Sequence, residues 1–148
     1  MHEMYGAGHL IEAGVALFEA TGESRLLDVG RRFADHIMSE FGPSGRLGYP
    51  GHQELEIALV RLSSSTGEAK YGEYARWLTL SRGTKPSPYE AELSDPEVCA
   101  LAPGVRPLFI KDGSYDGAYA QDDVPLVEQT RAVGHAVRAM YLYCGALD

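Results

Sequence analysis

Three histidines follow a glycine, and each lies in or next to a segment of helical character. They are found in the pairs Gly8-His9, Gly51-His52 and Gly134-His135. His2 precedes His9 by two helical turns, so the two side chains share one helix face. Imidazole both donates and accepts hydrogen bonds near neutral pH. If the segments that carry them converge, we expect His2, His9, His52 and His135 to form a polar pocket suited to sugar hydroxyls.

Two other interpretations of these histidines stay open. A single histidine is more often a buried residue bonded to a backbone carbonyl, and the glycine beside it can simply relieve crowding between close helices. A metal site is the weaker alternative, because the spacings are long and no local pair of ligands accompanies them. His36 falls on the polar face of its helix, where we expect it to be solvated.

Carboxylates are the second group with chemical potential. A glycosidase needs two carboxyl groups at a defined separation, and Glu12, Glu54 and Glu128 are candidates on composition. Glu54 also has a structural interpretation, since negative charge at a helix N-terminus is favoured by up to ~1 kcal/mol. Motifs for serine hydrolases, nucleotide-binding loops and zinc fingers do not occur.

Apolar spacing predicts helices over residues 4–20, 24–41, 52–65, 69–82 and 127–147. The first, third and fifth are apolar on most faces, so we expect them to be buried, whereas the other two are amphipathic. We expect Tyr71, Tyr74 and Trp77 to pack in the core, and likewise four side chains of the last helix: Val133, Val137, Met140 and Tyr143.

A short turn motif repeats between the helices. Thr21-Gly22-Glu23 recurs 45 residues later as Thr66-Gly67-Glu68. In each motif the glycine can adopt the left-handed conformation that ends a helix, and Ser24 can cap the helix that follows. The unit is therefore inner helix, turn and outer helix, repeated two and a half times. Such units bury their apolar faces by stacking in a solenoid or a ring.

Residues 84–125 interrupt this pattern with six prolines, which exclude long helices there. We predict a long surface loop with a turn at residues 112–117 and one short strand near residues 108–110. Tyr89, Tyr115 and Tyr119 are treated as exposed residues of this loop that can contact sugar faces.

Composition excludes several classes of protein. The chain has 148 residues, with 13 Lys and Arg against 21 Asp and Glu, a net charge of −8. This balance argues against nucleic-acid binding. Without a run of ~18 apolar residues or a secretory leader, no membrane partner is expected. Cys99 and Cys144 do not form a disulfide framework, so a cytoplasmic location is the expectation.

Several strings, in this order along the chain, resemble glycoside hydrolase family 127. They are Tyr5-Gly6-Ala7-Gly8-His9-Leu10-Ile11-Glu12-Ala13, Arg32-Phe33-Ala34-Asp35-His36-Ile37, Gly48-Tyr49-Pro50-Gly51-His52-Gln53-Glu54, Tyr119-Ala120-Gln121-Asp122 through Pro125, Glu128-Gln129 and Ala132-Val133-Gly134-His135-Ala136-Val137-Arg138-Ala139. The resemblance covers nearly the whole chain outside residues 84–118.

The resemblance implies a retaining β-L-arabinofuranosidase that acts on an L-arabinofuranose-containing oligosaccharide. The implied fold is all-α, a partial (α/α)6 barrel or helical toroid of about two and a half helix pairs plus a long loop. Residues 1–148 would then be a fragment of one α/α-barrel catalytic domain. The rest of that domain, or a second copy of the chain, would cover its apolar edges. The resemblance also implies that His9, His52, His135 and His2 line the sugar pocket.

The family chemistry implied by this resemblance uses a zinc-bound cysteine as nucleophile and a glutamate as acid/base. Zinc keeps a thiolate deprotonated, as a nucleophile requires. This chain has neither Cys-Cys nor Glu-x-Cys, and Gly6 stands where a cysteine is usual. Asp123-Val124 likewise replaces a basic pair. We therefore expect no catalytic residue, metal ligand or cofactor in this chain, zinc belonging to the full-length enzyme.

A different class is a tetratricopeptide-like interaction module, in which similar turns join helices. Its period is ~34 residues, however, and the offset here is 45. We therefore rank this alternative below the glycoside hydrolase.

Overall fold

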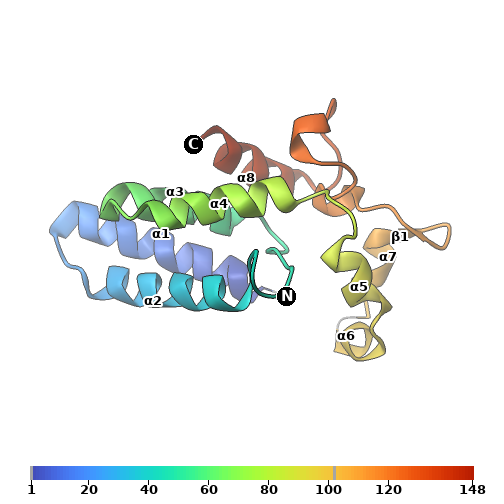
Figure 1. Cartoon of the computed structure of the whole chain (residues 1–148), viewed down its shortest axis with the longest axis horizontal. Helices are drawn as coiled ribbons and strands as arrows, with labels where there is room; N and C mark the ends of the chain where they lie inside the picture. The colour runs from blue at the N-terminus through green and yellow to red at the C-terminus, as the bar shows by residue number, and fades with distance from the viewer. Residues whose placement is uncertain (1, 102) are drawn as a thin grey trace.

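Long helices dominate the fold (Figure 1). The structure is a computed structural model that describes residues 2–101 and 103–148. They are α1 (Glu3–Thr21), α2 (Arg25–Glu40), α3 (Glu54–Thr66), α4 (Ala69–Ser81) and α8 (Ala136–Leu147). The first four begin and end within two residues of the predicted ranges. Among the described residues, no helix combines the length and the apolar character needed to cross a bilayer.

The two predicted turns end α1 and α3. Gly22 and Gly67 adopt left-handed φ angles of 76° and 74°, and each N–H donates to the backbone carbonyl four residues earlier at 2.8 Å. The predicted cap by Ser24 is wrong. Its backbone is helical, with φ −94° and ψ −12°, instead of extended as in a capping residue. The Ser24 hydroxyl donates to Asp28 at 3.3 Å.

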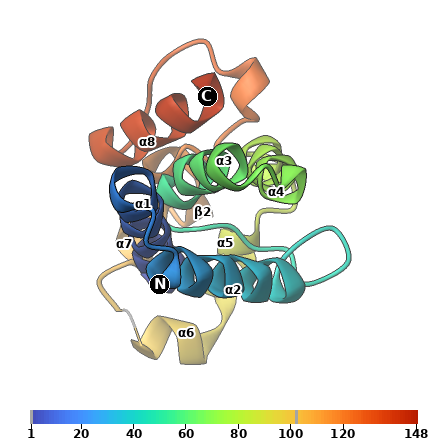
Figure 2. The ribbon, with the colours of Figure 1, turned by 90° about the vertical axis from the view of Figure 1, so that its left-hand side faces the viewer.

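The helices form an inner row and an outer row. In the inner row α3 packs between α1 and α8, while α2 covers α1 and α4 covers α3 (Figure 2). This is the all-α arrangement expected for part of a helical toroid. Side chains with no exposed surface fill the space between the rows: Ile11, Val15, Leu55, Leu59, Leu62 and Leu78. Burying each contributes about 1.5–3 kcal/mol.

Aromatic side chains of α4 pack as predicted. Tyr71 and Tyr74 are buried, and Trp77 stacks on Tyr74 with ring centroids 5.5 Å apart.

The start of the last helix differs from the prediction. Helix α8 begins at Ala136 instead of near residue 127, and residues 126–128 form only a 3-10 turn. Gly134 has a φ of 73°, and a Cβ there would lie 1.9 Å from the Ala118 carbonyl oxygen. This close approach to a distant segment keeps the chain out of helical geometry just before α8.

The buried face of α8 also differs from the prediction. Val137 and Met140 are 50% and 55% exposed, whereas Arg138, Ala139 and Leu142 are buried. The reason is that α8 packs against α3 and α4 with one face only. Its other face is an exposed apolar edge.

The proline-rich segment contains several short elements instead of an irregular loop. They are α5 (Pro88–Ser94), α6 (Pro96–Leu101), α7 (Arg106–Phe109), β1 (Ile110–Lys111), β2 (Ser114–Tyr115) and a 3-10 turn (Ala118–Ala120). The strand falls later than predicted, because Pro107 occupies the first turn of α7, where proline is tolerated. Ile110 pairs with Tyr115 across the predicted turn.

Asp122 fastens this segment to the helices. Its carboxylate accepts hydrogen bonds from the hydroxyls of Tyr49, Ser87 and Tyr115 and from the Gly83 N–H at 2.8 Å. Asp122 is fully buried, so these bonds replace its hydration. They hold the chain between Gly83 and Asp122 in one place beside the inner helices.

Arg82 makes a second buried attachment. Its guanidinium donates to the carbonyls of Pro50 and Ala120 and lies 3.6 Å from Oε1 of Glu56. The backbone before α3 and the 3-10 turn at Ala118–Ala120 are thereby tied to the end of α4.

Candidate functional site

The four predicted histidines lie in one cluster. The ring centroids of His2 and His52 are 5.7 Å apart, and those of His52 and His135 are 6.0 Å apart. His9 contacts the cluster through Tyr5, whose ring centroid lies 4.5 Å from that of His9 and 4.9 Å from that of His52. The structure therefore brings together side chains that lie on, or just before, three separate inner helices.

Each histidine stands near the N-terminal end of an inner helix. His2 precedes α1 and His9 lies on its second turn, while His52 comes just before α3 and His135 just before α8. These three helices begin at the same end of the molecule, beside α5 and α7 (Figure 1). Hydrogen bonds fix the last position, because the His135 N–H donates to the Tyr119 carbonyl at 3.1 Å.

Glutamine side chains hold the segments around His52 and His135 together. Gln53 Nε2 donates to Gln121 Oε1 at 3.0 Å, and Gln121 Nε2 donates to the Val133 carbonyl at 2.8 Å. Both glutamines are fully buried. This connection is independent of the contact between α3 and α8.

His52 is neutral at physiological pH. Burial, followed by the nearby positive charge of Arg138, lowers the pKa of His52 to about 4. Within residues 2–101 and 103–148, the buried Nδ1 atoms of His52 and His135 have no hydrogen-bond partner. A neutral imidazole with a free nitrogen, as in His52, is suited to uncharged hydroxyl groups.

Glu54 lies beneath the cluster. It is the first residue of α3, only 3% exposed, and its Oε1 is 3.3 Å from Nδ1 of His9. Burial, with smaller contributions from Glu12 and Glu56, raises the pKa of Glu54 to about 8. The helix N-terminus is therefore not the dominant influence on this carboxyl group.

The other predicted carboxylates have different surroundings. Glu12 pairs with Arg61 at 2.6 Å, and Glu128 is exposed on the 3-10 turn. His36 is exposed on α2, as expected.

Two of the three loop tyrosines are structural. Tyr89, predicted to be exposed, is buried and donates to the Pro50 carbonyl at 2.7 Å, and Tyr115 donates to Asp122. Tyr119 alone of the three lies beside the cluster, with its ring 5.5 Å from that of His135.

Three residues at the site were not predicted from the residue pattern. Tyr5 contacts His9, Tyr141 lies 6.4 Å from His9, and the guanidinium of Arg138 is 4.7 Å from the Tyr119 ring. Helical spacing is the signal that could have found two of them. Tyr5 lies one turn before His9, and Arg138 lies one turn after His135.

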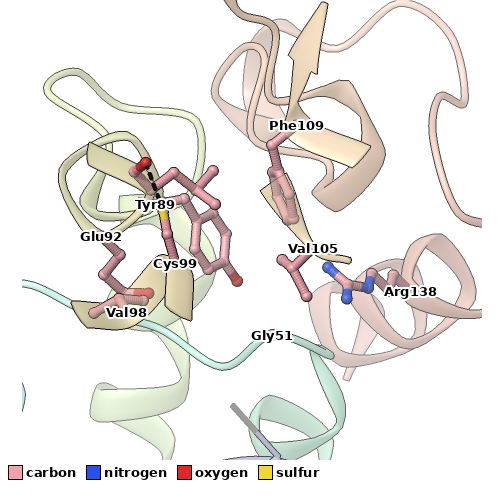
Figure 3. Close-up of a pocket in the computed structure, with 9 residues that line it drawn as sticks. Gly51, Tyr89, Glu92, Val98, Cys99, Val105, Phe109 and Arg138 are labelled. Carbon is pink, nitrogen blue, oxygen red and sulfur yellow. Dashed lines mark hydrogen bonds between the residues drawn. The ribbon is translucent and has the colours of Figure 1, made fainter. Parts of the chain in front are cut away.

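A cavity of about 50 Å³ lies beside Gly51, the residue before His52 (Figure 3). The residues that line it are Gly51, Tyr89, Glu92, Leu93, Val98, Cys99, Val105, Phe109 and Arg138. The Arg138 side chain extends toward it, between Val105 and α8. This cavity is large enough to hold water molecules but too small to hold a sugar ring.

Cys99 and Cys144 are both free thiols and form no disulfide with each other. Cys99 donates to the Leu93 carbonyl at 3.1 Å, and Cys144 is exposed on α8. In the described part of the chain, no group of three His, Cys, Asp or Glu side chains could hold a metal ion. The residues present therefore do not fit a zinc site.

Comparisons with known proteins agree on one family. Residues 1–148 match the family model described as β-L-arabinofuranosidase, GH127 catalytic domain. A non-reducing end β-L-arabinofuranosidase of Bifidobacterium longum subsp. longum is 38% identical over 146 residues. That alignment includes 97% of this chain and 21% of the relative.

Solved structures give the same result. A GH127 β-L-arabinofuranosidase from Geobacillus stearothermophilus T6 superposes with a TM-score of 0.80 at 40% identity, over 97% of this chain and 22% of that one. The GH127 β-arabinofuranosidase BT3674 superposes with a TM-score of 0.73 at 36% identity, over 97% and 19%. The chain thus spans about a fifth of these relatives, and with all of its residues matched it belongs to glycoside hydrolase family 127.

Proposed function

We propose that this chain forms the sugar-recognition wall of a retaining β-L-arabinofuranosidase. In this role His2, His9, His52 and His135 hydrogen-bond the hydroxyls of a terminal β-L-arabinofuranosyl residue. The nucleophile, the acid/base and the zinc ligands come from the rest of the catalytic domain.

The proposal rests on the proximity of the imidazole rings. The ring centroid of His52 lies 5.7 Å from that of His2 and 6.0 Å from that of His135, and Tyr5 lies between His52 and His9. Partly unpartnered imidazoles next to aromatic rings match the hydroxyls and apolar faces of a sugar. The family membership supplies the substrate class.

Two further features support this division of roles. The exposed apolar side chains of α8, Val137 and Met140, are suited to burial against the remainder of the domain or a second copy. A helical-repeat interaction module is not favoured, because the family match extends over residues 1–148.

The test is the substitution His52→Ala in the complete enzyme, this chain together with the rest of its catalytic domain. Removing a buried hydrogen-bonding partner costs about 1–3 kcal/mol, so kcat/KM on an aryl β-L-arabinofuranoside should fall roughly 5–150-fold. His36→Ala, on the exposed face of α2, is the matched control and should leave kcat/KM unchanged. Equal activity of the two variants would exclude His52 from sugar recognition.

A further inference from the structure

We infer that Glu54 is a positioning residue of the sugar site, whose carboxyl group engages Nδ1 of His9 and so leaves Nε2 to the substrate. This inference rests on the proposed function, because it takes His9 as a sugar-binding group. It extends that function by assigning a role to a buried carboxyl group that need not touch the sugar itself.

The geometry favours one ring nitrogen over the other. Oε1 of Glu54 is 3.3 Å from Nδ1 of His9, and the Glu54 side chain is 4% exposed whereas that of His9 is 49% exposed. The carboxyl group therefore approaches the histidine from the interior. Tyr5 meets the same ring edge to face at 4.5 Å, which restricts its rotation. The nitrogen on the far side of the ring is the one left for a ligand.

Gly8 makes this approach possible. A Cβ at residue 8 would lie 1.6 Å from Oε2 of Glu54 and 3.0 Å from Cα of Leu55. A side chain there would displace the carboxyl group or the α3 backbone. At Gly6, on the same helix, a Cβ would meet nothing within 4 Å. The Gly8-His9 pair thus has a physical reason, since the glycine admits the acid that holds the histidine.

A partner on Nδ1 has a chemical consequence. A free imidazole exchanges between two tautomers and two ring orientations, and a carboxyl group on one nitrogen selects among them. Among the described residues Oε2 of Glu54 has no hydrogen-bond partner, and Oε1 lies 3.3 Å from Nδ1 of His9. Nδ1 is occupied whichever of the two groups holds the shared proton, and Nε2 keeps its orientation toward the site.

A double-mutant cycle in the complete enzyme tests the inference. Glu54→Met removes the polar group at similar volume and should lower kcat/KM on an aryl β-L-arabinofuranoside about 10–100-fold. In a His9→Ala background the same substitution should change kcat/KM by no more than about twofold, because its effect passes through His9. A full-sized loss in that background would overturn the inference, since a merely structural role gives additive losses.

Matched variants guard against a folding defect. Gly8→Ala should reproduce the loss by displacing the carboxyl group, whereas Gly6→Ala should keep wild-type kcat/KM. Glu54→Gln retains an amide that can engage Nδ1 and should recover most of the activity.

If Glu54→Met fails to fold, Gly8→Ala in the two His9 backgrounds gives the same cycle, and an additive loss there would overturn the inference equally. If His9→Ala itself kept full activity, the role of His9 in the proposed function would fail first, which is a distinguishable result.

Discussion

The rings of His52 and His135 lie 6.0 Å apart although they come from segments that precede different inner helices. Two independent connections hold them there: the packing of α8 on α3, and the hydrogen bond between Gln53 and Gln121. A pair of imidazoles held in this way is preorganised for a ligand with several hydroxyl groups.

Replacing Arg138 should raise the pKa of His52. Arg138 is 6% exposed, and its charge is the second cause, after burial, that lowers the pKa of His52 to about 4. In Arg138→Met the pKa should rise but stay below 6.5, since burial remains. NMR titration of the His52 ring measures this shift. Arg76→Met, an exposed site on α4, should leave the titration unchanged, and an unchanged value in Arg138→Met would contradict the described electrostatics.

Glu54 should make the folded chain less stable as the pH rises. Its folded-state pKa is raised to about 8, against about 4.3 for an unperturbed Glu, so between these values the folded state holds the extra proton. The free energy of unfolding therefore falls with rising pH across that window. Urea denaturation at several pH values should show a weaker fall for Glu54→Gln.

Part of that pH dependence should survive in Glu54→Gln. Glu56 is fully buried, and burial raises its pKa to about 7 despite Arg82. If wild type and Glu54→Gln had identical pH dependence, Glu54 would already be ionised at low pH and its described burial would be wrong.

Asp122→Ala should loosen the whole segment from Gly83 to Asp122. The substitution removes the acceptor of Tyr49, Ser87 and Tyr115, at a cost of roughly 1–3 kcal/mol for each buried hydroxyl left unpaired. Chemical denaturation should show the loss, and limited proteolysis should cut first in this segment.

Asp35→Ala is the control for the Asp122 substitution. Asp35 forms an exposed ion pair with Lys70 at 2.7 Å, which is worth at most about 1 kcal/mol. Equal stabilities of the two variants would mean that Asp122 does not anchor the segment.

The chain by itself should hydrolyse an aryl β-L-arabinofuranoside little or not at all, even with zinc and a reductant. The described residues include no group that could hold a metal ion, Cys99 donates to the Leu93 carbonyl, and Cys144 is exposed on α8. Steady-state assays measure this. Turnover on the order of 1–10 s⁻¹, an ordinary enzymatic rate, would refute the proposed division of roles.

Local signals made the helix pairs predictable from the sequence. The turns at Gly22 and Gly67 depend on neighbouring residues only, and apolar spacing marks the helices. Convergence of the histidines was predictable for a related reason. Inner helices of stacked pairs lie side by side, so histidines carried on them or at their starts were expected to converge.

Long-range contacts determine what could not be predicted. Helix α8 starts late because Gly134 packs on the Ala118 carbonyl, and Tyr89 is buried because Pro50 accepts its hydroxyl. The contact of Glu54 with His9 likewise depends on the space that Gly8 leaves between α1 and α3. None of these contacts leaves a periodic or compositional pattern in the sequence.

Crystallography of the complete enzyme with L-arabinose bound is the most direct test of the sugar-recognition wall. We expect sugar hydroxyls within hydrogen-bond distance of His52, His135 and Nε2 of His9. A sugar bound elsewhere, with these imidazoles making no contact to it, would show that the histidine cluster is not the sugar site.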